Sequence, residues 1–356
     1  MNDSRWMRAA LAYAAGAVGS TSPNPSVACL IVNNGVLIAR GRTKPGGRPH
    51  AETEALRQAG GAAAGATAYV TLEPCSHHGV TPPCTDALIA AGVARVVVAC
   101  PDPNPKVNGG GVAALRDAGM SVTENVCRTE AEALNAPFFH YLRTGLPFVS
   151  VKVATSLDGR IALANGVSQW ITSPQSRALV QQWRSQADAL LTTAVTAQRD
   201  DARLTVRLPR VLRPPMRVLL DRRLTTPADA AIFAGQSMQP TWVFTALKGS
   251  SPGVRTLQVS EHDGKLNMRE ILEALGDAGV RHVLIEAGRG LLTHVWQENL
   301  WNRWLHMTAP SYLGADSLSV LGCLGLTTLP PIGGEDTVTE WWNKEMPKPG
   351  ITSNSF

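Results

Sequence analysis

The sequence predicts an α/β protein built from two domains, and three observations support that fold class. The chain has 356 residues, which is more than one hydrophobic core usually serves. Strand-like and helix-like segments alternate along both halves, a pattern typical of sheets flanked by helices. A set of metal-ligand residues occurs between positions 50 and 84 and does not recur later. We therefore expect one domain over residues 1–145 and a second over 146–356.

In the first half, the expected helices cover residues 5–18, 51–59, 84–91 and 129–142. The expected strands cover residues 27–32, 36–39, 68–72, 95–99 and 121–126. Pro23 and Pro25 end the first helix, because proline lacks the N–H group that a helix interior needs. Asn34-Gly35 is typical of a hairpin turn, so the strands on either side of it should pair.

In the second half, the expected strands cover residues 148–154, 189–193, 216–220, 241–245, 282–286 and 303–309, and the expected helices cover 174–186, 268–278 and 289–297. Ser173 followed by Pro174 is a strong helix start, because serine caps a helix and proline suits its first position. The buried face of that helix is expected to contain Leu179, Val180, Trp183 and Ala187. The tail after about residue 330 gives no pattern that we can interpret.

The composition argues for a small-molecule enzyme rather than a nucleic-acid or membrane protein. The net charge of +5 is modest, and no run of basic residues is present. No apolar stretch is long enough to cross a membrane. The six cysteines lack the spacing of a disulfide framework, which favours a reducing compartment. We expect a soluble, cytoplasmic protein that acts on a small anionic substrate.

His50, Cys75 and Cys84 are the residue types of a catalytic zinc site. One imidazole and two thiolates leave the fourth tetrahedral position open for water. Zinc lowers the pKa of that water, and a carboxylate that is not a ligand can carry its proton. Glu52 is the expected carrier, because residues two apart on a helix point in different directions. The order of these residues resembles the H-x-E and P-C-x-x-C signature of zinc deaminases, with a wider loop between the cysteines.

Other interpretations of these residues are weighed against the zinc site. His50 could cap a helix, and the two cysteines could be buried thiols. His77 and His78 lie in the widened loop, where they could replace a thiolate, but we expect them to face the substrate. A non-catalytic zinc module and a tRNA-editing deaminase are further alternatives. Glu52 argues against the first, and the absence of a basic patch argues against the second.

The second half lacks an ordinary dinucleotide-binding fingerprint, because no G-x-G-x-x-G begins this half between a strand and a helix. The nearest segment is EAGRGL at residues 286–291, between an expected strand and an expected helix. Backbone N–H groups at such a position can hold a cofactor phosphate. Arg177 and Arg184 lie seven residues apart and should share an exposed helix face. Such a pair can bind phosphate, although a solvated charged face is the commoner interpretation.

Two stretches carry a resemblance to one family. The sequences PGGRPHAE at 45–52 and TLEPCSHHGVTPPC at 71–84 resemble the bifunctional deaminase/reductases of riboflavin biosynthesis, and the wide cysteine loop is a feature of that family. The segments at 151–160, 168–173 and 200–207 resemble its reductase half, so that the resemblance covers residues 5–315. It implies a cytidine-deaminase-like three-layer α/β domain and a dihydrofolate-reductase-like α/β domain, with zinc and NADPH as cofactors. It also implies a homodimer.

The resemblance assigns further roles, residue by residue. It supports zinc ligation by His50, Cys75 and Cys84 and proton transfer by Glu52, and it implies that Asp200 or Lys152 assists proton transfer in the reductase half. The implied NADPH contacts are Ala154, Trp170, Thr196, Asp200, Gly288, Arg289, Gly290, Leu291, Leu292, Thr293 and His294. The substrate contacts are Ser168, Arg184, Leu204, Arg207, Glu286, Asn24 and His77, with Arg177 left on the surface.

The segment 102–105 and Asn24 line the substrate pocket in the resembled family. Asparagine, aspartate and proline also favour turns on their own account, so a purely structural role for Asn24, Asp102 and Asn104 is equally well supported by the residues alone.

The implied reaction is deamination of a diaminopyrimidinone ribosyl phosphate, followed by NADPH-dependent reduction of the ribosyl chain to a ribityl chain. The chain departs from the family in the reductase half, at 193–199, at Ala202, at Ala287, at Arg222 and at 301–304. These departures motivate an alternative: a deaminase whose second domain binds nucleotide and has lost reduction.

Overall fold

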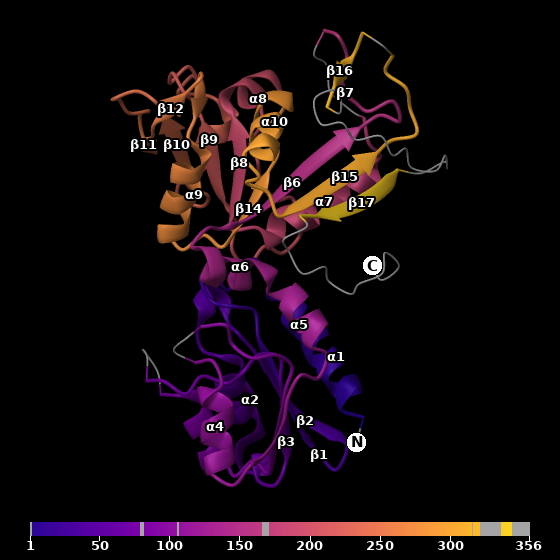
Figure 1. Ribbon diagram of the computed structural model, residues 1–356, viewed down its shortest axis with the longest axis vertical. Coiled ribbons are helices and arrows are strands. Elements are labelled where there is room, and N and C mark those ends of the chain that lie inside the picture. Colours follow the sequence, from indigo (N-terminus) through magenta and orange to yellow (C-terminus); the bar gives the residue numbers. More distant parts are fainter. Residues whose placement is uncertain are drawn as a thin grey trace. The chain divides into compact units, whose positions relative to one another are not determined.

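The computed structural model describes residues 2–78, 82–104, 107–165, 171–314, 316–320 and 336–343. Within these residues the chain divides into two compact units, with the division between Gly145 and Leu146. Figure 1 labels most of the elements of both units. None of the described helices has the length and apolar character that a membrane crossing requires.

The first unit contains a mixed sheet in the order β2-β1-β3-β4-β5. Its strands are β1 (Ala28–Asn33), β2 (Val36–Arg42), β3 (Thr67–Val70), β4 (Arg95–Val98) and β5 (Ser121–Thr123). The hairpin of β1 and β2 is antiparallel, as the turn at Asn34-Gly35 predicts, and β1 also pairs antiparallel with β3. The remaining pairs are parallel, so β3 and β4 end at the same edge of the sheet. Loops at that edge are where α/β proteins usually build their sites.

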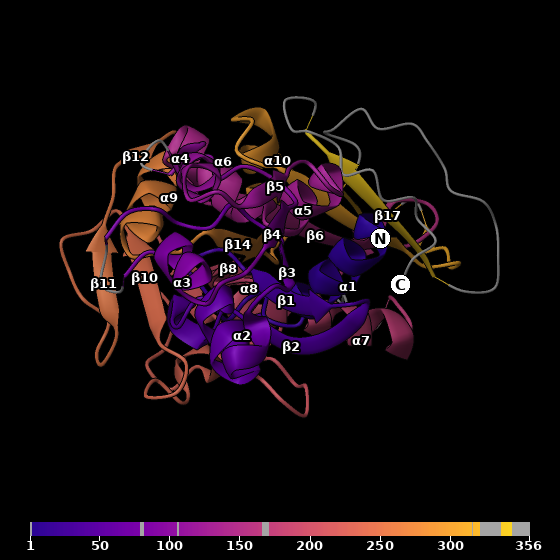
Figure 2. The same ribbon diagram turned by 90° about the horizontal axis from the view of Figure 1, so that it is seen from below.

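Helices cover both faces of this sheet. They are α1 (Asp3–Ala15), α2 (Ala51–Ala59), α3 (Cys84–Ala90), α4 (Gly110–Asp117), α5 (Arg128–Leu134) and α6 (Ala136–Thr144), with short 3-10 turns at Pro45–Gly47 and Gly60–Ala63. In Figure 2, α2, α3 and α4 lie on one side of the strands, and α1 and α5 lie on the other. The expected three-layer fold is therefore confirmed for this unit.

The prediction of a single connecting helix over residues 129–142 is wrong. The structure has two helices, α5 and α6, with Asn135 between them in a non-helical conformation. Pro137 explains the break, because its ring and missing N–H are tolerated only in the first turn of a helix. The side chain of Asn135 then bonds to the backbone N–H and C=O of Ser26, at 2.8 and 3.0 Å, and so attaches this corner to the segment before β1.

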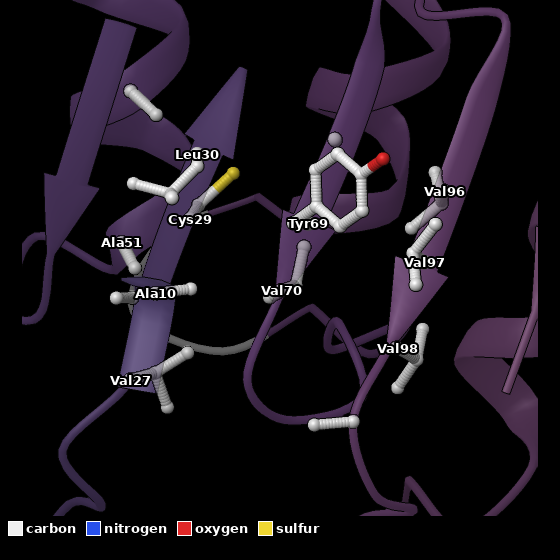
Figure 3. Packing of buried hydrophobic residues seen from close by; sticks show 14 of the residues in the cluster. Ala10, Val27, Cys29, Leu30, Ala51, Tyr69, Val70, Val96, Val97 and Val98 are labelled. Atoms are coloured by element: carbon white, nitrogen blue, oxygen red, sulfur yellow. The ribbon is translucent and has the colours of Figure 1, made fainter. Parts of the chain in front are cut away.

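The core of the first unit lies between its sheet and helices. Figure 3 shows buried side chains that belong to β1, β3 and β4, with Tyr69 among them. The hydroxyl of Tyr69 donates a 2.9 Å hydrogen bond to Asp3, and Arg95 makes an ion pair with the same carboxylate at 2.7 Å. This contact fixes the start of α1 against β3 and β4.

The second unit contains a larger sheet in the order β11-β10-β9-β8-β14-β6-β15-β17. Its strands are β6 (Phe148–Thr155), β8 (Ala189–Thr193), β9 (Met216–Leu220), β10 (Thr241–Thr245), β11 (Arg255–Gln258), β14 (His282–Ile285), β15 (Arg303–Thr308) and β17 (Thr337–Trp342). All neighbouring strands are parallel except β17, which runs antiparallel to β15 at the edge.

Alternate residues of each strand enter two separate cores. Leu191, Val218 and Val283 pack with α9 (Met268–Asp277) and α10 (Arg289–Gln297) on one face. Leu190 and Leu219 pack with α7 (Pro174–Gln186) and α8 (Ala194–Arg199) on the other. Figure 2 shows these two helix pairs on opposite sides of the strands. The expected α/β layering of this unit is confirmed.

Some elements of the second unit escape sequence reasoning. They are the short helix α8, the strand β11, the strand β17 in the uninterpreted tail, the pair β7 (Arg160–Ala162) and β16 (Leu318–Ser319), the pair β12 (Glu261–His262) and β13 (Lys265–Leu266), and a 3-10 turn at Ala231–Phe233. The expected buried face of α7 is partly wrong: Val180, Trp183 and Ala187 are buried, but Ser176 and Gln181 join them and Leu179 is only half-buried.

Candidate active sites

Three metal-ligand residues of the first unit converge on one point. His50 is the residue before α2, Cys75 lies in the loop after β3, and Cys84 is the first residue of α3. One ligand atom from each of them lies within 4.8 Å of the others. His50 Nδ1 is 3.7 Å from the sulfur of Cys75 and 3.4 Å from the sulfur of Cys84.

These separations fit a tetrahedral zinc ion. Zinc–sulfur bonds of about 2.3 Å and zinc–nitrogen bonds of about 2.0 Å, at a tetrahedral angle, place the two ligand atoms about 3.5 Å apart. Both measured distances lie close to that value. Three protein ligands leave one position of the tetrahedron for a reacting molecule, which is the pattern of a catalytic zinc site.

The environment of the two thiols prepares one of them to ionise. The backbone N–H of Cys84 donates to the sulfur of Cys75 at 3.4 Å. The hydrogen bond between the two side chains lowers the pKa of Cys75 to about 4 and raises the pKa of Cys84. A thiolate is the form that ligates metal, so this arrangement favours metal binding at neutral pH.

Glu52 lies in the first turn of α2 with only 4% of its surface exposed. Burial raises the pKa of its carboxyl group to about 6, with His50, Cys75 and Cys84 as its charged or hydrogen-bonding neighbours. A carboxyl group that titrates near neutrality can both accept and return a proton. Glu52 therefore has the position and the acidity expected of the proton carrier.

The other residues expected at this site are brought to its edge. Asn24 donates a 3.0 Å bond to the C=O of Gly47, in the turn just before His50, so that its amide has a structural role. His77 is exposed in the loop between the two cysteines. Asp102 follows β4 and is 8% exposed, and burial raises its pKa to about 6. Its carboxylate accepts from the N–H of Asn104 at 2.9 Å, which is the turn chemistry considered for this segment.

In the second unit, the expected residues gather at the carboxyl ends of the parallel strands. Glu286 follows β14 and forms a two-bond ion pair with Arg184 of α7, at 2.5 and 2.9 Å. Arg184 also donates to the C=O of Thr205 at 2.9 Å. The expectation of an exposed Arg184 is therefore wrong: only 12% of its side chain is exposed, because Glu286 and Thr205 occupy it. The bonds to described residues use three of its five N–H groups, which leaves two of them for a ligand.

Lys152 of β6 lies beside this ion pair. Burial lowers the pKa of its ammonium group, against the attraction of Glu286 and Asp200. Burial opposes the ionised form of Glu286, but Arg184, Lys152 and Arg207 together hold its pKa below the ordinary value. These residues form a group of opposite charges around Glu286, and ionisable groups with shifted pKa values often occur at catalytic sites.

The segment 200–207 is held against α7. The side-chain oxygen of Gln181 accepts from the N–H of Arg207 at 2.8 Å. Leu204 is buried with a left-handed backbone, φ +46°, and its C=O accepts from Gln239 at 2.9 Å. Gln181 and Gln239 are thus positioning residues that sequence reasoning missed, because an isolated glutamine gives no signal in the sequence.

The residues expected to hold NADPH lie on two neighbouring helix starts. Thr196 is in α8, whose start is capped by Thr193. Gly288 precedes α10, and a Cβ atom on it would lie 3.9 Å from the hydroxyl of Thr196. Gly288 provides no side-chain cap, so the first N–H groups of α10 are available to a phosphate.

The rest of the expected cofactor set lies on α10, α8 and β6. Arg289, Gly290, Leu291, Leu292, Thr293 and His294 form the first turns of α10, with Leu291 and Leu292 buried in the core. Within the described residues neither ring nitrogen of His294 has a hydrogen-bond partner. Ala154 is in β6, and Asp200 ends α8. Ser168 and Trp170 lie outside the described residues.

Comparisons with known proteins identify the family of both halves of the chain. The model described as the cytidine and deoxycytidylate deaminase zinc-binding region matches residues 1–100, and the model described as the RibD C-terminal domain matches residues 147–330. The riboflavin biosynthesis protein RibD of Escherichia coli K12 is 43% identical over 346 residues, which cover 93% of this chain and 92% of the relative. RibD of Aquifex aeolicus is 40% identical, with 92% of each chain covered.

Solved structures extend the likeness to the fold. A structure of Acinetobacter baumannii RibD is 41% identical, with a TM-score of 0.82 and 89% of each chain covered. A Thermotoga maritima protein is 32% identical, with a TM-score of 0.85 and coverage of 95% of this chain and 97% of that one. Its description is diaminohydroxyphosphoribosylaminopyrimidine deaminase/5-amino-6-(5-phosphoribosylamino)uracil reductase.

Proposed function

This chain belongs to the family of RibD riboflavin biosynthesis proteins, and we propose which of its residues carry the two reactions of that family. It is a bifunctional enzyme: a zinc-dependent deaminase and an NADPH-dependent reductase. We assign the deaminase to residues 1–145 and the reductase to residues 146–356, in line with the separate cores of the two units.

In the deaminase, His50, Cys75 and Cys84 would hold the zinc. When bound, zinc supplies Lewis-acid chemistry that turns a water molecule into a nucleophile at neutral pH. Glu52 takes the proton from that water and passes it to the departing amino group, which leaves as ammonia. The observation that carries this assignment is the convergence of the three ligand atoms beside a buried carboxyl group with a pKa of about 6.

The substrate that we propose is 2,5-diamino-6-(5-phosphoribosylamino)pyrimidin-4(3H)-one. We expect Asn24, His77 and the segment after β4 that holds Asp102 and Asn104 to border the substrate. Their amide and imidazole groups can hydrogen-bond to the polar edge of a pyrimidine. This assignment agrees with the described activity of the Thermotoga maritima protein.

A Glu52→Gln variant tests the deaminase assignment. Glutamine keeps the shape and cannot carry the proton, so ammonia release should fall by about 100- to 10,000-fold while zinc content stays unchanged. Glu54→Gln is the matched control, because Glu54 is on the same helix and pairs with Lys44 and Arg57 rather than with the site. Normal ammonia release from Glu52→Gln would refute the role of Glu52.

In the reductase, NADPH supplies the hydride. Lys152 or Asp200 assists proton transfer; both Glu286 and Asp200 attract the ammonium group of Lys152 electrostatically. The Arg184–Glu286 pair holds this charge group in place and offers its remaining N–H groups to the substrate, together with Leu204 and Arg207. The product is 5-amino-6-(5-phosphoribitylamino)uracil.

We assign the NADPH phosphates to the start of α10, at Gly288 and Arg289, next to Thr196 of α8. Ala154 and Asp200 would contact the nicotinamide half, and Trp170 completes the expected cofactor set. The uncapped N–H groups of α10 support the phosphate position.

Loss of NADPH absorbance with the deaminated substrate tests the reductase assignment. Lys152→Met should reduce this rate by about 100-fold or more, because it removes a group placed for proton transfer. Lys248→Met, at an exposed position of the same unit, is the control and should react normally. Equal rates for the two variants would remove Lys152 from the mechanism.

We also propose that the enzyme is a cytoplasmic homodimer, on the analogy of its family. Light scattering after size-exclusion chromatography should give twice the chain mass of 37.9 kDa. A monomeric mass at assay concentration would refute the dimer.

A further inference from the structure

Glu73 lies two residues before the zinc ligand Cys75 and is 3% exposed. Its carboxylate accepts four hydrogen bonds, all from backbone N–H groups. One oxygen accepts from Gly111 at 2.9 Å and from Val112 at 3.1 Å. The other accepts from Asp102 at 3.2 Å and from Gly109 at 3.1 Å. A single side chain thus connects the loop after β3 to Asp102, which follows β4, and to the start of α4.

These bonds replace a local helix cap. Gly109 occupies the cap position of α4 with a left-handed backbone, φ +78°, and has no side chain to offer. The N–H groups at the start of a helix need an acceptor. Glu73 supplies it from another loop, and an ionised carboxylate suits the task because it only accepts hydrogen bonds.

The fit between the two segments is close. A Cβ atom on Gly111 would lie 2.0 Å from the C=O oxygen of Pro74 and 3.2 Å from the carboxylate of Glu73. A Cβ on Gly110 would lie 3.0 Å from the hydroxyl of Ser76. The start of α4 therefore packs directly on the Pro74-Cys75-Ser76 turn. The N–H of Glu73 also donates to the C=O of Cys100 at 3.0 Å, which adds a fifth bond across the same boundary.

We propose that Glu73 is a positioning residue for the deaminase: its four accepted bonds hold the substrate-facing segment at Asp102 and Asn104 in register with the zinc ligand Cys75. This inference rests on the proposed deaminase function, in which that segment borders the substrate. Glu73 itself touches neither the zinc nor the substrate. It acts on substrate binding through the loop that it holds.

Glu73→Gln is the direct test. Whichever way the amide turns, its NH2 group faces two N–H donors, so that two of the four bonds become repulsive. The value of kcat/KM for ammonia release should fall by about 10- to 100-fold, mainly through a higher KM. Zinc content and the NADPH oxidation rate should stay unchanged. Amide hydrogen exchange at Gly109, Gly111 and Val112 should become faster.

Two further variants keep the test decisive. Glu73→Asp retains the charge, but its side chain is too short to accept from both pairs of N–H donors. Its KM should therefore lie between those of wild type and Glu73→Gln. If Glu73→Gln does not fold, the KM of Glu73→Asp tests the proposal in its place. Glu124→Gln is the matched control, because Glu124 follows β5 and pairs with Arg116, near the far end of α4 from Glu73. Its KM should stay within about twofold of wild type.

Two outcomes would overturn the proposal. One is a wild-type KM and kcat in Glu73→Gln. The other is a loss of zinc and of kcat in both Glu73 variants with no change in KM, because that pattern means that Glu73 only stabilises the fold. Failure of the wild-type protein to release ammonia would instead refute the deaminase function itself, so the two failures are distinguishable.

Discussion

Gly41→Ala should disable the deaminase without touching any residue of its site. Gly41 lies on β2, and a Cβ atom there would be 2.1 Å from the C=O oxygen of Ala51 and 2.4 Å from the nitrogen of Ala55. Real Cβ atoms essentially never approach other atoms within 3.0 Å. The backbones of β2 and α2 must therefore move apart by at least the difference, 3.0 − 2.1 = 0.9 Å.

That movement reaches the catalytic groups directly. Ala51 lies between His50 and Glu52, so a shift of its carbonyl carries both side chains with it. Misplacement of a reacting group by 1 Å can cost about 100-fold in rate. Overpacking of this kind also lowers the free energy of unfolding by about 1–3 kcal/mol. We expect the deaminase kcat to fall by about 100-fold, with a lower thermal midpoint for the first unit.

Ammonia release, zinc content and NADPH oxidation should be measured on the same preparation. Gly61→Ala is the matched control, because Gly61 follows the same helix and a Cβ atom on it would meet nothing within 4 Å. The control should match wild type in all three measurements, and Gly41→Ala should retain NADPH oxidation. Deamination at the wild-type rate in Gly41→Ala would refute the close approach of β2 and α2 on which the reasoning depends.

Three further outcomes are expected. Removal of zinc by a chelator should abolish ammonia release. It should also lower the thermal midpoint of the first unit, because Cys75 and Cys84 lose the ion that holds them together. A parallel loss of NADPH oxidation would contradict a zinc role confined to the first unit. Arg184→Lys should lower kcat/KM of the reduction by about 10- to 100-fold, since lysine cannot make the two-bond pair with Glu286, and an unchanged value would exclude the pair from substrate binding. Burial lowers the pKa of His282 to about 3, so below pH 6.5 the unfolded chain takes up a proton that the folded chain rejects. The second unit should lose about 3 kcal/mol of unfolding free energy between pH 7 and pH 4, and His282→Gln, followed by denaturant unfolding at each pH, should remove most of that slope.

The sequence predicts the elements well where hydrophobic pattern and punctuation agree. The helix of residues 51–59 and the strands of 189–193, 216–220 and 241–245 begin and end where they are expected. Each is bounded by a change in polarity, a glycine or a proline. The strand β17 (Thr337–Trp342) is not predicted from the sequence. It is an edge strand that forms by pairing with β15, and such pairing depends on the neighbouring strand rather than on local residue preference.

The zinc site is predictable for a related reason. Metal ligation restricts residue type and order so strongly that His50, Glu52, Cys75 and Cys84 are identified by position in the chain alone. Glu73 is different, because its role depends on four N–H groups contributed by residues far along the chain. Arg184 illustrates the same limit: helix periodicity gives its face, but not the carboxylate of Glu286 that buries it.

The departures in the reductase half can now be judged by where they lie on the sheet. Trp301 stacks on Trp296 with ring centres 4.9 Å apart, and Asn302 exchanges two hydrogen bonds with Val149. The first contact joins the segment before β15 to α10, and the second joins it to β6. Both lie at the amino ends of the parallel strands, whereas the charge group around Glu286 lies at the carboxyl ends. The glycine-poor stretch 193–199 does lie at a carboxyl end, and there Thr193 accepts the N–H of Thr196 and starts a capped helix. A capped helix restricts the backbone more than a glycine-rich loop does. The residues at 301–304 are therefore explained by packing. The residues at 193–199 form a capped start of α8, which keeps the backbone ordered on the side of the sheet where we expect the cofactor.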